Sequence, residues 1–323
     1  MRIEYPEYYE KFHCLAEACP DTCCKDWEVD VDEDTFYYYR VQEGTLGEKL
    51  NRLLKEEGEA KYIPLREDGR CPFLREDGLC EICAALGEEG LSQTCQEYPR
   101  YYMGIGDYEQ IDLSLSCMEV GRLLFTGKGP VHYVKDTDEE EPWETLEEGE
   151  QERLANVLKL RDEILQSLAG YEAGTENAEE VLPEILPDES ADEELLELIP
   201  ELEILDTEGA GLIAAIQQDY IEIRDCEAAF RERYEELLRR LFTRFAAYLV
   251  YRYTIDSYYE DMENVRRLWR RSLRLVLLMC INCDRQSGSF GIGSMIRLTH
   301  SFSRQIEHSD ENLELWKTRR TAP

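Results

Sequence analysis

The sequence has little positive charge and few histidines. Its 36 Lys and Arg residues face 71 Asp and Glu residues, which gives a formal net charge of −35 at pH 7. Proteins that bind nucleic acid need clustered Lys and Arg to neutralise phosphates, so this balance argues against a nucleic-acid partner. The four histidines are too scattered to indicate a histidine metal site or a general base; they are His13, His132, His300 and His308.

Long apolar runs are also absent. The segment "RIEYPEYYEKFH" after Met1 has no apolar core of signal-peptide length, and no later stretch reaches the ~18 uninterrupted apolar residues of a membrane span. We therefore expect a soluble, cytoplasmic protein with no membrane partner. At ~100–200 residues per domain, a chain of 323 residues is expected to hold two or three domains.

Cysteine, by contrast, is concentrated near the start of the chain. Nine of the twelve cysteines lie within the first 117 residues: Cys14, Cys19, Cys23, Cys24, Cys71, Cys80, Cys83, Cys95 and Cys117. Thiols in a reducing cytosol stay reduced and serve as metal ligands or reactive groups, so this cluster predicts a metal-binding module. We interpret the other three, Cys226, Cys280 and Cys283, as small buried hydrophobic residues on apolar helix faces.

The cysteine spacing leaves the metal open. The pattern C-x4-C-x3-C-C, followed by C-x8-C-x2-C-x11-C, matches no ordinary zinc-finger spacing. Cys80 and Cys83 are close enough in sequence to hold one metal from two sides. The side chains of Cys23 and Cys24 should diverge, so either these two serve two centres or only one of them is a ligand. Thiolate ligation suits both zinc and a four-iron cluster, so the metal and the number of centres are not decided by spacing.

Composition divides the chain into three regions and favours a mainly α fold. Residues 1–127 are predicted to form a loop-rich cysteine module, because short apolar runs are broken by the turn signals "REDGR" and "REDGL". Residues 128–208 are predicted to be an acidic linker with short helices, since positions 136–208 hold 27 acidic residues against 3 basic ones. Residues 209–323 are predicted to form an α-helical domain.

Apolar spacing predicts individual helices within these regions. One helix is expected within residues 32–57, and another over "RLANVLKLRDEILQSLAG", which ends at Gly170. The preceding segment "DTDEEEPWETLEEGEQE" has the composition of a solvated linker. Residues 172–208 should form short helices joined by proline turns, and residues 226–308 are strongly helical in pattern. No internal repeat is visible.

Five arginines lie close together in the last region: Arg266, Arg267, Arg270, Arg271 and Arg274. Such a cluster could bind the carboxylate of a ligand or an acidic partner. We favour pairing with the acidic middle of the chain, which offers many carboxylates.

Three cysteine-bearing segments resemble a known family. The runs "HCLAEACPDTCCKDW", "CPFLREDGLCEICAALGEEGLSQTCQEYPRYY" and "LSLSCMEVGRLLF" occur in this order within residues 5–127, and they are similar to flagellin lysine-N-methylases. Those enzymes are part of a wider family of cysteine-cluster proteins described as zinc- or iron-chelating. The resemblance implies methylation of flagellin lysines with S-adenosylmethionine as donor, and a metal or 4Fe-4S cluster bound by the nine cysteines of residues 14–117.

Two familiar S-adenosylmethionine signatures are missing. No glycine-rich strand–turn–helix fingerprint is visible, and "GSFGIGSM" does not follow a clear strand. The C-x3-C-x2-C run of radical enzymes fails at Asp26. The catalytic and donor-binding residues are therefore not identified. Two other functions stay open from the residues alone: a non-catalytic protein that binds or delivers metal, and an iron–sulfur electron carrier.

Overall fold

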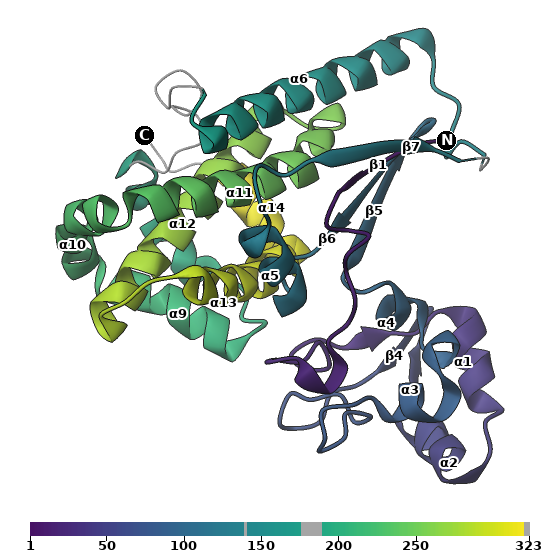
Figure 1. Cartoon of the computed structure of the whole chain (residues 1–323). Coiled ribbons are helices and arrows are strands. Elements are labelled where there is room, and N and C mark those ends of the chain that lie inside the picture. Colours follow the sequence, from purple (N-terminus) through teal and green to yellow (C-terminus); the bar gives the residue numbers. More distant parts are fainter. Residues whose placement is uncertain (139–140, 176–188, 320–323) are drawn as a thin grey trace. The chain divides into compact units, whose positions relative to one another are not determined.

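The computed structural model describes residues 1–138, 141–175 and 189–319 (Figure 1). By contacts between its residues the chain divides into two compact units. The helical unit comprises Met1–Phe12, Tyr102–Ser116 and Val120–Pro323, and the cysteine unit comprises His13–Tyr101 and Cys117–Glu119. The fold is mainly α, as predicted, with a loop-rich region that carries the cysteines.

The first strand of the chain lies inside a sheet of the helical unit. The sheet has the order β5-β6-β1-β7 and consists of β1 (Arg2–Pro6), β5 (Arg100–Ile105), β6 (Tyr108–Leu113) and β7 (Tyr133–Thr137). β1 runs parallel to β6 and antiparallel to β7, so that Glu4 is paired with Gln110 on one side and Lys135 on the other. The segments Met1–Phe12 and Tyr102–Ser116, which we expected in the cysteine module, therefore group with the helices because of this strand pairing.

Helices form most of the helical unit. The buried helix α12 packs on most of the other helices of the unit, and the long helix α6 packs along α11. The helices are α5 (Met118–Thr126), α6 (Glu148–Ala173), α8 (Asp192–Leu198), α9 (Thr207–Gln218), α10 (Tyr220–Arg233), α11 (Glu235–Thr254), α12 (Met262–Ser287), α13 (Ile292–Phe302) and α14 (Asp310–Thr318). The helical pattern predicted for residues 226–308 is confirmed. In the described part of the chain, no helix combines the length and apolar character needed to cross a membrane.

Helix α6 starts inside the segment that we predicted to be a linker. Glu147 and Glu150 form a capping box, in which the side chain of each residue accepts a hydrogen bond from the backbone N–H of the other. The apolar stripe is confirmed, since Leu154 and Leu168 are buried in the helix. The helix ends at Gly174, whose φ of +74° terminates it four residues beyond the predicted stop. The linker prediction is thus wrong from residue 148 onward, because capping stabilises this acidic first turn. Within residues 172–208, positions 176–188 lie outside the described residues, and α8 with the short turn Ile199–Glu201 fits the prediction.

The cysteine unit is small and has its own apolar core. A three-stranded sheet of order β2-β4-β3 contains β2 (Val29–Asp30), β3 (Lys55–Glu57) and β4 (Ala60–Ile63). Its helices are α1 (Glu33–Arg40), α2 (Gly44–Leu53), α3 (Glu81–Leu86) and α4 (Gln93–Glu97). Phe36 of α1 and Leu50 of α2 are buried in one cluster with Phe73.

The single helix expected within residues 32–57 is wrong; two helices and a strand occupy this range. Gly44 has a φ of +72°, which breaks the helical path at a position where other residues would be strained. Gly47 lies so close to the preceding loop that a Cβ there would be 2.0 Å from the Gln42 carbonyl oxygen. These two glycines let the chain fold back, and the predicted apolar face still enters the core.

Two of the five clustered arginines of α12 pair with acidic residues of the middle region, as we favoured, whereas Arg270 pairs with Glu263 of α12 itself. Arg274 is buried and donates to both oxygens of Asp192, and its Nη1 lies 2.7 Å from Glu227 Oε1. Arg271 Nη2 lies 2.8 Å from Glu194 Oε2. The cluster therefore stabilises the packing of α8 on α12.

The sheet is tied to α6 by one buried arginine. Arg161 has no exposed surface, and its Nη2 lies 2.6 Å from Glu4 Oε2 on β1. Its Nη1 donates to Tyr108 Oη at 2.6 Å and to Gln110 Oε1 at 2.8 Å, both on β6. The Arg161 guanidinium thus contacts two adjacent strands, and its charge is balanced by the Glu4 carboxylate, which is itself buried.

Replacing Arg161 should destabilise the helical unit strongly. In Arg161→Met the buried Glu4 carboxylate loses its counter-ion, and we expect a loss of about 3–5 kcal/mol in the free energy of unfolding, measured by urea denaturation. The matched control is Lys135→Met, which removes an exposed ion pair with Asp162 and should cost about 0–1 kcal/mol. Equal losses in the two variants would contradict this reading of Arg161.

Candidate functional site

All nine cysteines predicted to bind metal lie in the cysteine unit, whereas Cys226, Cys280 and Cys283 lie in the helical unit. Cys280 is fully buried, as expected of a packing residue, while Cys226 and Cys283 are partly buried. The uneven distribution along the sequence therefore corresponds to a real spatial separation.

Two similar tight turns bring cysteines back toward the first cysteine run. In "REDGR" the Arg66 N–H donates to the Arg70 carbonyl at 2.8 Å, and in "REDGL" the Arg75 N–H donates to the Leu79 carbonyl at 2.9 Å. Gly69 has a φ of +76° and Gly78 a φ of +80°, which only glycine adopts without strain. Each turn is followed at once by a cysteine, Cys71 and Cys80 respectively.

Three of these cysteines share the core of the unit. The Cys71 N–H donates to the Cys24 carbonyl at 2.8 Å, so the two residues lie side by side. Cys71 is buried among Val29 and Phe73, and Cys24 and Cys80 pack against the same cluster. An isolated antiparallel β-bridge pairs Leu74 with Cys80.

Cys95 is electrostatically close to this group. Loss of hydration raises the pKa of Cys71 to about 11, and the charges of Cys24 and Cys80 act in the same direction. Loss of hydration likewise raises the pKa of Cys95 to about 12, although part of this residue is exposed. A hydrogen bond with Ser92 lowers this pKa, whereas the charges of Cys24, Cys80 and Cys71 raise it further. Cys24, Cys71 and Cys80 therefore all act on Cys95, and a cation would stabilise these four thiols as thiolates.

The other cysteines are distributed around this set. Burial raises the pKa values of Cys19 and Cys83, and the charge of Cys14 raises both further. The neighbouring Cys23 thiol raises the pKa of Cys24, and burial adds to the increase.

Thiols in this number are chemically suited to zinc or an iron–sulfur cluster. In the described residues, however, no three His, Cys, Asp or Glu side chains converge at the distances that a metal ion requires. The donor chemistry fits a soft metal, while the side-chain positions do not form a closed ligand shell.

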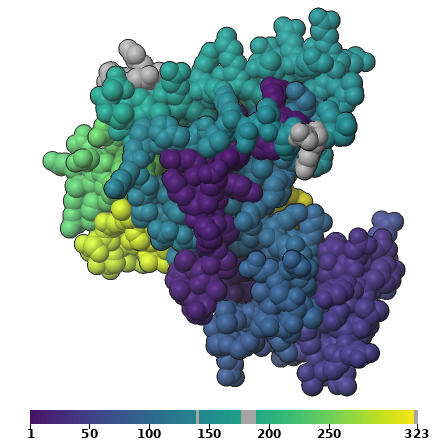
Figure 2. Space-filling model, turned by 45° about the vertical axis from the view of Figure 1, so that its right-hand side comes forward, coloured from purple at the N-terminus to yellow at the C-terminus, as the bar shows by residue number. Residues whose placement is uncertain are grey.

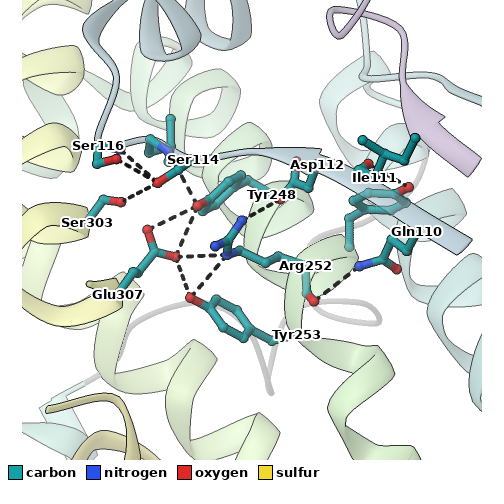
Figure 3. A network of polar contacts seen from close by, with 12 residues as sticks. Gln110, Ile111, Asp112, Ser114, Ser116, Tyr248, Arg252, Tyr253, Ser303 and Glu307 are labelled. Carbon is teal, nitrogen blue, oxygen red and sulfur yellow. Dashed lines mark hydrogen bonds and ion pairs between the residues drawn. The ribbon is translucent and has the colours of Figure 1, made fainter. Parts of the chain in front are cut away.

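The helical unit contains a second candidate, a buried polar network around Arg252 of α11 (Figure 3). Arg252 lies between two carboxylates: its Nη1 is 3.4 Å from Asp112 Oδ2, and its Nε is 3.8 Å from Glu307 Oε1. Tyr253 Oη donates to Glu307 Oε1 at 2.6 Å, and Tyr248 Oη donates to Glu307 Oε2 at 3.0 Å. Burial raises the pKa values of both phenols, and the Glu307 charge adds to the increase. Both tyrosines are therefore hydrogen-bond donors at neutral pH.

Serines at the end of β6 extend this network. Ser114 Oγ lies 2.8 Å from Ser116 Oγ and 3.3 Å from Ser303 Oγ (Figure 3). His308 Nε2 lies 2.7 Å from Ser116 Oγ. Sequence reasoning did not identify this network, because isolated serines and tyrosines are common and most of the partners are distant in sequence, from 54 positions for Tyr253 and Glu307 to 192 for Ser116 and His308. The alternating serines of "LSLSC" were the one local signal.

Asp112 is the most perturbed carboxyl group of the network. It is fully buried, which raises its pKa to about 6, and the Arg252 charge limits the increase. One of its oxygens, Oδ1, has no hydrogen-bond partner among the described residues. Such a group is costly in its charged form.

Stability should therefore fall as Asp112 ionises. Because its pKa is higher in the folded state than the ordinary value of 3.8, Asp112 favours the folded state below about pH 4, and this contribution is lost as the pH rises to about 6. Between these values the contribution changes by up to about 1.4 kcal/mol per pH unit. Asp112→Asn should remove this slope from urea-unfolding free energies measured across the same range. Asp107→Asn is the control: Arg2 lowers the pKa of the Asp107 carboxyl group, so the slope between pH 4 and 6 should remain in this variant. An unchanged slope in Asp112→Asn would refute the assignment.

Comparison with known proteins gives matches over part of the chain. Lysine-N-methylases of Salmonella typhimurium and Salmonella choleraesuis, and the flagellar biosynthetic protein FliU of Salmonella muenchen, are each 35% identical to it over 128 residues, or 37% of the chain. The match covers 31% of each lysine-N-methylase, so the chain spans about a third of their length, and it covers 75% of FliU. No family model and no solved structure matches. With three quarters of FliU matched at this identity, the chain belongs to the family of the flagellar biosynthetic protein FliU.

Proposed function

We propose that the protein transfers methyl groups from S-adenosylmethionine to lysine side chains of flagellin. The observation that carries this proposal is the 35% identity to two proteins named lysine-N-methylase, together with the flagellar name of the third relative. The name lysine-N-methylase supplies the reaction, and the flagellar name supplies the substrate.

The reaction needs an uncharged lysine nitrogen. The ε-ammonium first releases a proton, and its lone pair then attacks the methyl carbon of the sulfonium. The new N–C bond forms as the C–S bond breaks, and S-adenosylhomocysteine leaves as a neutral thioether. Both reactants are cations before proton loss, and a protein of net charge −35 attracts both over long range.

We further propose that the cysteine unit holds zinc or an iron–sulfur cluster. Cys24, Cys71, Cys80 and Cys95 would supply one set of four thiolates, because the first three share one core and all three raise the pKa of Cys95. When bound, the metal would cross-link loops in a unit of fewer than 100 residues, where a hydrophobic core alone gives little stability. The membership in a wider zinc- or iron-chelating family stays a prediction.

The methylase proposal is tested with protein purified without air and with its metal retained. Incubation with flagellin and isotopically labelled S-adenosylmethionine should place label on lysine, detected by mass spectrometry of the digested flagellin. Flagellin whose lysines have been acetylated is the matched control and should stay unlabelled. Absence of label on native flagellin would refute the proposal.

The metal proposal predicts a difference between cysteines of the two units. Cys71→Ser should lose most of the bound metal, because a core thiolate is removed, whereas Cys226→Ser on α10 should keep it. Iron, zinc and acid-labile sulfide are measured per chain, with the visible absorption spectrum. Equal metal in both variants would contradict the assignment. Ready transfer of metal to an acceptor protein, without methyl transfer, would favour a delivery protein, and a reversible redox transition without methyl transfer would favour an electron carrier.

A further inference from the structure

Two aromatic side chains of the helical unit are unusually exposed. Trp143 is 59% exposed and Tyr259 is 66% exposed, the highest values among aromatic residues in the part of the chain that the structure describes. Large rings of this kind are normally buried, and when they are held at the surface they often mark a binding site.

The segment that carries Trp143 is anchored through its backbone. The Trp143 backbone N–H donates to the Gly106 carbonyl at 2.9 Å, which ties the segment to the turn between β5 and β6. The indole lies over Gly104, where a Cβ would be 2.3 Å from its ring nitrogen. Leu146, three residues on, is buried against Gly106. Trp143 is thus presented to solvent by an anchored segment.

Tyr259 is held beside the same segment. Its ring meets that of Tyr258 edge-on, with centroids 4.8 Å apart. Tyr258 is buried in one hydrophobic cluster with Leu146 and Leu154, so both aromatic positions rest on a shared core. The carboxylate of Glu144 acts on both phenols and raises the pKa of each, after the effect of burial.

Acidic groups surround these rings, with few cations to balance them. Glu144 forms no ion pair with any described residue, and the exposed first turn of α6 adds Glu147, Glu148 and Glu150. This end of α6 lies on the outside of the helical unit, where its residues are teal in Figure 2. A basic side chain placed here would gain a carboxylate and an aromatic face together.

A surface groove lies along the start of α6. It has a volume of ≈ 450 Å³, and its lining includes Glu152, Asn156, Val157 and Met262. Arg153 also lines the groove and lies over the ring of Tyr258, the residue before Tyr259, at 5.6 Å. Its mixed apolar and polar walls suit an extended polypeptide.

We infer that Trp143, Glu144, Tyr259 and this groove form the docking surface for a lysine-bearing segment of the polypeptide substrate. The inference rests on the proposed function for the identity of the partner. An ammonium bound against an aromatic face is stabilised by the ring quadrupole, and the Glu144 carboxylate adds charge attraction. Methylation leaves the positive charge in place, so the surface accepts both substrate and product.

Binding is measured without a methyl donor, so that it does not depend on catalysis. A fluorescently labelled, extended peptide with several lysines is titrated with the full chain, and anisotropy reports affinity. Trp143→Ala and Glu144→Gln should each weaken binding about threefold or more, and high salt should weaken it further. Tyr37→Ala on α1 of the cysteine unit, also exposed at 55%, is the control and should leave affinity unchanged. A peptide with glutamine in place of lysine should bind more weakly.

Several outcomes would overturn the inference. Unchanged affinity in both Trp143→Ala and Glu144→Gln would do so, and so would equal binding of the glutamine peptide, which would indicate an apolar partner. Self-association of the wild type that Trp143→Ala abolishes would indicate a second copy of the chain. Methyl transfer to flagellin with an unchanged KM in both variants would refute the docking surface alone. Peptide binding without methyl transfer by the wild type would refute the proposed function alone.

Discussion

The buried ion pair between Glu4 and Arg161 is the constraint on which the helical unit depends. It places the first strand of the chain between β6 and β7 and fixes α6 against that sheet. Because alternate residues of a strand face the same side, Tyr108, Gln110 and Asp112 point toward the helices together. Gln110 accepts from Arg161 and donates to the Arg252 carbonyl at 3.2 Å, so the two buried arginines are joined through one side chain. A single strand therefore organises the charges of α6 and α11.

Buried charged residues in the sheet explain why sequence reasoning identified the long helices of the helical unit but not the sheet. Helix stripes such as Leu154 to Leu168 are visible because apolar residues recur on one face. In β6 all six residues are buried, including Glu109 and Asp112, so the alternation that marks a half-exposed strand is absent. A charged residue in a short segment normally indicates solvent exposure. Asp112 is buried beside Arg252, which lies 140 positions away in the sequence.

The cysteine unit shows a similar division between local and long-range information. The turns at Gly69 and Gly78 were readable from "REDG", and they place Cys71 and Cys80. Which thiols meet was not readable, since Cys24, Cys71 and Cys95 are joined by the packing of separate segments. The adjacent pair Cys23 and Cys24 illustrates the limit: the sequence did not show that Cys23 would be the neighbour that raises the pKa of Cys24 most.

The charge of the acidic middle has two different roles. Asp192 and Glu194 are neutralised by arginines of α12, so they hold α8 in place and contribute little to the external field. The exposed carboxylates around Glu147 at the start of α6 have no comparable set of buried arginines, and they also favour the helix by their position at its N-terminus. An acid excess distributed in this way concentrates negative potential at one end of α6. Net charge alone could not locate that potential, because it counts paired and exposed carboxylates equally.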